Sequence, residues 1–70
     1  MLMKKLSVLR KMLTGREAIV LKLLSKGCTA QQIAGRLFIS VDTVKKHLQN
    51  SYRKLEANNK ITALKKAGML

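Results

Sequence analysis

The most distinctive side chains of this 70-residue sequence lie in a predicted helix between Ser40 and Leu55. Gln49 follows Lys45 by four positions and Lys46 by three, so the three side chains share one helix face. Lysine can donate to O6 and N7 of guanine, and glutamine can pair with N6 and N7 of adenine. The pattern therefore predicts a face that reads base edges in a nucleic-acid groove. The alternative is a solvated face without a partner, as charged stripes often are.

Other polar residues are placed to hold the same helix against phosphate groups. Thr43 lies in its predicted first turn, where a hydroxyl and free helical N–H groups can bind an anion. Helix capping explains the same residue nearly as well. Lys54 and Lys60 lie beyond the part expected to enter the groove. The residues predicted to contact phosphate or position the helix are Thr29, Ser40, Thr43, Arg53, Lys54 and Lys60.

Groups that support catalysis or metal binding are scarce in the sequence. His47 is the only histidine and has no evident nucleophile or metal-ligand partner, so a structural position between core and backbone is predicted. Cys28 is the only cysteine and is expected to pack as a small hydrophobic residue between helices. Tyr52 is expected to pack in the core with its hydroxyl at the surface. No enzymatic activity, cofactor, metal or small-molecule substrate is predicted.

Charge narrows the class of partner. Fifteen lysines and arginines stand against three acidic residues, which gives a formal net charge of +12. A field this strong favours a polyanion, with nucleic acid the first candidate and an acidic membrane surface the second. No apolar run approaches the roughly 20 residues that span a bilayer, and charges interrupt the N-terminal segment before a secretory signal can form. The expected location is the cytoplasm, which a single cysteine also fits.

The elements that must position these residues are helices. The chain has no proline and few aromatic residues, and a domain this small buries only about 60% of its unfolded surface. Thr14 with Glu17, and Thr29 with Gln32, form two capping boxes that mark helix starts. The sequence predicts an all-α domain over residues 13–70, preceded by a linker or amphipathic extension at 1–12. The predicted helices cover about residues 15–26, 30–37, 41–55 and 60–67.

The second and third predicted helices are joined by only three residues and form a helix-turn-helix. The third helix should bury a stripe that includes Val44, Leu48 and Leu55. Phe38 stands in the turn, where this motif often has glycine, so the turn must form without a left-handed glycine.

Motifs across residues 13–67 resemble the LuxR/GerE-type helix-turn-helix family, the output domain of quorum-sensing activators and many response regulators. Departures from the family pattern are Glu56 and Lys60, where glycine and arginine are common, and residues 30–32, where Asn-Lys-Glu is frequent. The matching motifs are Leu13-Thr14-x-Arg16-Glu17, Val20-Leu21-x-Leu23-Leu24, Gly27, Ile33-Ala34, Leu37, Ile39-Ser40, Thr43-Val44-Lys45-x-His47-Leu48 and Tyr52-x-Lys54-Leu55.

The resemblance implies a four-helix domain that binds double-stranded DNA sequence-specifically and regulates transcription. Its third helix would enter the major groove, and Lys45, Lys46 and Gln49 match the base-reading positions. Its fourth helix would help to pair two copies as a homodimer on a roughly two-fold site. RNA polymerase is a further expected partner of such a regulator.

Two other functions stay open from the sequence. One is a basic helical module that binds a membrane surface or a protein partner, suggested by the leucines and lysines of residues 1–12. The other is a promoter-reading domain of the sigma-factor type, which shares the helix-turn-helix but lacks the capped helix that starts after Thr14. Charge placement separates the membrane- or protein-binding module from DNA binding, because the basic residues of the segment 45–60 gather around the predicted groove helix.

Overall fold

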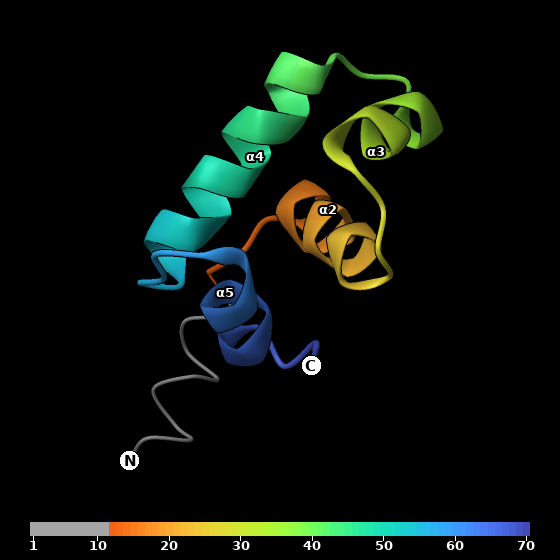
Figure 1. Ribbon diagram of the computed structural model, residues 1–70. Coiled ribbons are helices and arrows are strands. Elements are labelled where there is room, and N and C mark those ends of the chain that lie inside the picture. The colour runs from red at the N-terminus through yellow and green to blue at the C-terminus, as the bar shows by residue number, and fades with distance from the viewer. Residues whose placement is uncertain (1–11) are drawn as a thin grey trace.

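The computed structural model describes residues 12–70, and it is all-helical within that range (Figure 1). The predicted extension or linker at the N-terminus therefore lies outside the described residues, except for Met12. The all-α prediction is confirmed, and each predicted helix is present with boundaries shifted by at most one residue. The helices are α2 (Gly15–Ser25), α3 (Ala30–Leu37), α4 (Val41–Lys54) and α5 (Lys60–Lys66).

Both capping boxes form as predicted. The Glu17 N–H donates to Thr14 Oγ1 at 3.1 Å, and the Thr14 N–H donates to Glu17 Oε1 at 2.9 Å. Thr29 and Gln32 make the equivalent pair of bonds at the start of α3, at 3.2 and 2.9 Å. Each box satisfies backbone donors that a helix start otherwise leaves unpaired.

The remaining helix starts also carry side-chain caps. Ser40 Oγ accepts from the Thr43 N–H at 3.1 Å, and Asn59 Oδ1 accepts from the Thr62 N–H at 2.9 Å. A cap of this kind stabilises a helix by about 1 kcal/mol. The starts of α4 and α5 can therefore be predicted from capping residues in the sequence.

Two turns place a residue other than glycine in the left-handed region. Phe38 follows α3 with φ 56°, and Glu56 follows α4 with φ 52°. The Phe38 N–H still donates to the Ala34 carbonyl, so the residue ends the helix as a glycine would. A side chain in this region costs about 1–2 kcal/mol. The helix-turn-helix is thus closed at a local energetic cost.

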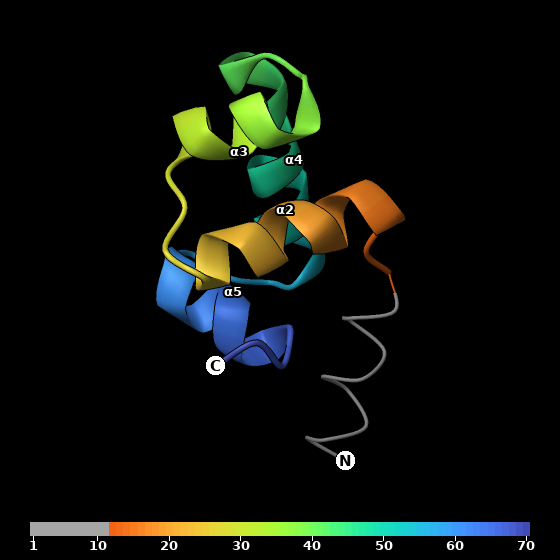
Figure 2. The ribbon, with the colours of Figure 1, turned by 90° about the vertical axis from the view of Figure 1, so that its right-hand side faces the viewer.

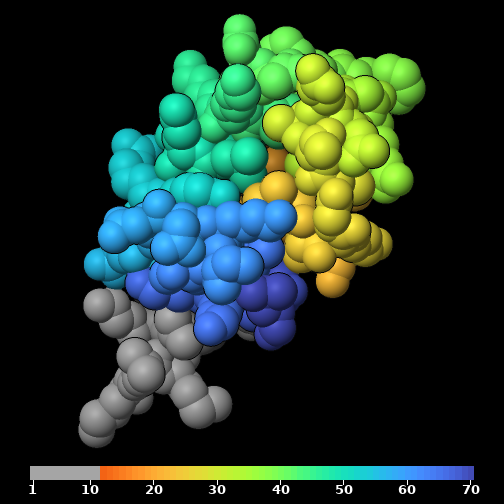
Figure 3. Space-filling view, in the orientation of Figure 1, coloured from red at the N-terminus to blue at the C-terminus, as the bar shows by residue number. Residues whose placement is uncertain are grey.

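The core consists of two clusters that meet at α2. Figures 1 and 2 show α2 between α5 on one side and the α3–α4 pair on the other. Much of α2 is hidden on the face in Figure 3 by its neighbours. The α2–α4–α5 cluster contains Leu21, Leu55, Ala63, Leu64 and Ala67, and the α2–α3–α4 cluster contains Val20, Cys28, Ile33, Ala34 and Val44.

The side chains shared between the clusters fix the direction of α4. Leu24 of α2 and Leu48 of α4 pack against both clusters, so α4 cannot rotate without disturbing each of them. Cys28 is buried, which confirms the prediction that it packs as a small hydrophobic residue. Tyr52 is half-buried against the α2–α4–α5 cluster, and burial raises the pKa of its hydroxyl.

Candidate nucleic-acid interface

The α4 helix presents a buried face and a charged face, as its periodicity predicted. Val44 and Ser51 are fully buried, and the Ser51 hydroxyl donates to the His47 carbonyl at 2.7 Å. This bond satisfies a buried hydroxyl within the helix itself. The exposed side chains of α4 are Asp42, Lys45, Lys46, Gln49 and Arg53.

The polar residues predicted to touch phosphate are divided between the two ends of α4. Ser40 and Thr43 lie at its start, where their hydroxyl oxygens are 2.8 Å apart. Arg53 and Lys54 lie at its end, and Arg53 Nη2 donates to Asn50 Oδ1 at 3.2 Å. A helix of 14 residues is about 21 Å long, whereas the major groove is about 12 Å wide. The two ends are therefore farther apart than the groove is wide.

The other two predicted phosphate contacts lie on neighbouring helices. Thr29 is an exposed residue that caps α3, and its hydroxyl is already a hydrogen-bond acceptor there. Lys60 is the exposed first residue of α5. On the same helix, Lys66 Nζ donates to the Glu56 carbonyl at 2.7 Å, which ties α5 to the left-handed turn after α4.

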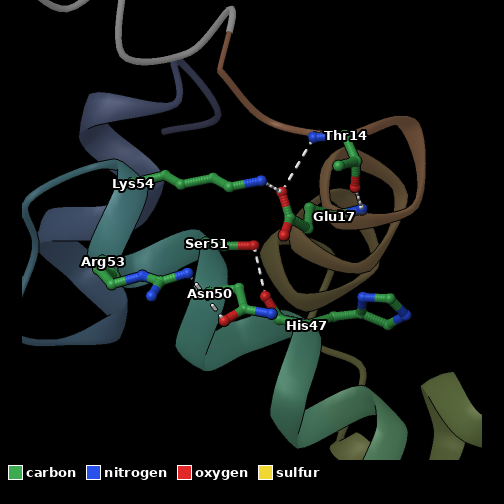
Figure 4. Close-up of polar contacts among 7 residues, drawn as sticks. All are labelled: Thr14, Glu17, His47, Asn50, Ser51, Arg53 and Lys54. Carbon is green, nitrogen blue, oxygen red and sulfur yellow. Dashed lines mark hydrogen bonds and ion pairs between the residues drawn. The ribbon is translucent and has the colours of Figure 1, made fainter.

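An ion pair that sequence reasoning missed joins α4 to α2. Lys54 Nζ lies 2.8 Å from Glu17 Oε1, the same oxygen that accepts from the Thr14 N–H (Figure 4). The Glu17 side chain is 4% exposed and the Lys54 side chain 24%. The contact links the last turn of α4 to the first turn of α2, so it gives Lys54 a role in the fold beside its predicted phosphate contact.

The environment of Glu17 makes its charge part of the stability of the domain. Burial raises the pKa of Glu17, but the hydrogen bonds from Lys54 and Thr14 outweigh burial and hold that pKa below its ordinary value. A glutamate with a lowered folded pKa stabilises the fold fully above its unfolded pKa of about 4.3, and this contribution is lost as the pH falls through the folded pKa.

We therefore expect the free energy of unfolding to fall below about pH 4.3 with a slope that depends on Glu17. Urea unfolding of the parent and of Glu17→Gln at several pH values measures that slope. In the variant, the free energy of unfolding should depend less steeply on pH in the acid range than in the parent. If the free energy of unfolding fell equally steeply with acid in Glu17→Gln and in the parent, this assignment would be contradicted.

The described part of the chain shows no cluster of metal-ligating side chains. Between residues 12 and 70, no three His, Cys, Asp or Glu side chains lie close enough to hold a metal ion. His47 is half-buried, and its ring extends away from the Glu17–Lys54 pair (Figure 4). The arrangement that stands out is thus the exposed, donor-rich face of α4.

Comparison with known proteins identifies the family of this chain. The chain matches the family described as bacterial regulatory proteins, luxR family, over residues 11–67. It is 45% identical over 51 residues to a nitrate/nitrite response regulator protein homolog of Haemophilus influenzae, covering 73% of this chain and 24% of that protein. It is 42% identical over 62 residues to the response regulator protein VraR of Staphylococcus aureus, covering 89% of this chain and 30% of that protein.

The chain thus spans less than a third of the length of these two relatives. No solved structure matches it significantly. The family match covers α2, α3, α4 and α5. The chain belongs to the LuxR family of bacterial regulatory proteins.

Proposed function

We propose that this domain binds double-stranded DNA sequence-specifically, with α4 in the major groove, as the output domain of a response regulator. The observation that carries the proposal is the exposed face of Lys45, Lys46 and Gln49 on a helix whose opposite face is locked into two core clusters. Such a helix can present donors at fixed positions with little loss of backbone freedom. Lys45, Lys46 and Gln49 contact base edges, and the regulated process is transcription.

The contacts to phosphate position the domain. Ser40 and Thr43 contact DNA phosphates where α4 begins, and Thr29 does so from the start of α3. Near the other end of α4, the phosphate contacts come from Arg53, Lys54 and Lys60. Phosphate contacts fix register and orientation without reading sequence. Lys54 makes its contact only to the extent that Glu17 releases it, so Lys60 is the cleaner test of this class.

A homodimer on DNA is supported by the surface of α5. Ile61 is 52% exposed on this short helix, next to the basic residue Lys60. A second copy would bury that apolar side chain on a roughly two-fold site. RNA polymerase is the partner through which a bound regulator would act on transcription in the cytoplasm. Among the described residues, no helix has the length and apolar character required to cross a membrane.

Replacing base-reading residues should change sequence preference, whereas replacing a phosphate contact should not. Lys46→Ala and Gln49→Ala should each lose about 1–3 kcal/mol at the base pair contacted, because a bidentate contact of this size is removed. Lys60→Ala should weaken binding to all duplexes alike and make the log-log salt slope shallower by about one. The measurement is affinity for a duplex selected from a random pool and for its scrambled version, at several salt concentrations.

All three side chains are exposed, so thermal melts should match the parent and serve as the folding control. Equal losses on both duplexes for all three variants would show that α4 acts as a non-specific basic patch. The function would then be architectural, or binding to another anionic surface.

A further inference from the structure

Phe38 is an unusual residue for its place in the fold. Its exposed fraction is 93%, against 66% for Leu70, the next most exposed large apolar residue in the range 12–70. It also occupies the left-handed region with φ 56°, which a bulky side chain rarely adopts. The domain thus places an aromatic ring in water at a position where glycine or asparagine would close the turn at lower cost.

Burial of the ring does not offset that cost. A side chain that is 93% exposed contributes almost no burial to the α2–α3–α4 cluster beside it. Residues held in sparsely populated backbone regions cluster at active sites, ligand clamps and switch regions. An external partner for the ring is the explanation that the geometry favours.

The position of Phe38 indicates what that partner is. Phe38 stands two residues before Ser40, the N-cap of α4, so their Cα atoms are at most about 7 Å apart. The N-terminal part of a recognition helix is the part that touches base edges, in a groove about 12 Å wide. Exposed Arg36 and Lys45 lie nearby in sequence and favour a polyanion over an apolar protein surface.

We propose that Phe38 is a specificity-determining residue whose ring contacts the C5-methyl group of a thymine at the edge of the site bound by α4. The thymine methyl is the apolar group that the major groove presents, and phenylalanine is one of the side chains that read it. This inference rests on the proposed function, because it requires α4 to lie in the groove.

Deoxyuridine substitution tests the contact. A preferred duplex is first recovered from a random pool with the 70-residue protein, and each of its thymines is then replaced in turn by deoxyuridine, which lacks only the methyl group. One replacement should weaken binding of the parent about fourfold, the effect of one buried methyl-sized group. The same replacement should leave the affinity of Phe38→Gly unchanged, and Phe38→Tyr should keep the parental fourfold loss.

Two controls separate recognition from folding. Phe38→Gly should melt at a higher temperature than the parent, because glycine relieves the left-handed backbone, so weaker binding cannot come from unfolding. Ile19→Ala trims another exposed apolar side chain, on α2, and should keep the parental dependence on the thymine methyl.

The proposal is overturned if the parent shows no such position, or if Phe38→Gly loses as much affinity as the parent at every deoxyuridine. Either result leaves the preference for the selected duplex, and hence the proposed function, intact. Failure of the parent to select any duplex would instead reject the proposed function, and the Phe38 contact with it.

Discussion

Raising the salt concentration from about 50 to 200 mM should weaken DNA binding by roughly 250- to 1,000-fold. The expectation follows from a net charge of +12 and from the exposed lysine and arginine side chains of α4 and α5. If each copy neutralises about five phosphates, the log-log slope of affinity against salt should be roughly −4 to −5. Titrations of a fluorescent duplex at four or more salt concentrations measure the slope.

A thermal melt at each salt concentration is the control, because the domain must remain folded throughout the range. A slope near zero would rule out electrostatic docking, whatever the affinity. A steep slope on scrambled as well as selected duplexes is expected too, since counterion release depends on phosphates and not on bases. The salt experiment therefore tests electrostatic binding to the phosphates, and the Lys46 and Gln49 variants test recognition of the base sequence.

The helix boundaries could be predicted from the sequence because the interactions that set them are local. In each capping box the two partners lie three positions apart, so one look at residues 14–17 or 29–32 shows both of them. The buried face of α4 follows from apolar spacing, for the same reason. Helical periodicity also placed Lys45 and Lys46 on the exposed face, although their contact with bases stays a prediction.

Contacts between distant segments could not be predicted in this way. Glu17 and Lys54 are 37 positions apart, and nothing in either local pattern indicates that the end of α4 meets the start of α2. The position of Lys54 beyond the groove helix suggested a phosphate contact, whereas its geometry adds an intramolecular partner. Phe38 could be recognised as a departure from a glycine turn, but its 93% exposure depends on how α3 and α4 pack.

The Glu17–Lys54 pair should be the polar contact on which the fold depends most. Lys54→Met should lower the free energy of unfolding by about 2–3 kcal/mol, because it leaves a buried carboxylate without its cationic partner. Removing one partner of a fully buried ion pair costs about 3–5 kcal/mol. We expect a smaller loss here, since the Lys54 side chain is 24% exposed. For a domain of this size the melting temperature should fall by roughly 10–20 °C.

A double-mutant cycle with Glu17→Gln distinguishes the pair from two independent contributions. Glutamine can keep the capping box, as Gln32 does at the start of α3. Glu17→Gln alone therefore loses only the ion pair with the partly exposed Lys54, which should cost about 1 kcal/mol. Adding Glu17→Gln to Lys54→Met should restore part of the lost stability, because the stranded carboxylate is then neutral. If Lys54 serves only as a phosphate contact, Lys54→Met will melt like the parent and lower the salt slope by about one. Lys60→Ala supplies the reference for that behaviour, and simple additivity in the cycle would show that the two charges do not act as a pair.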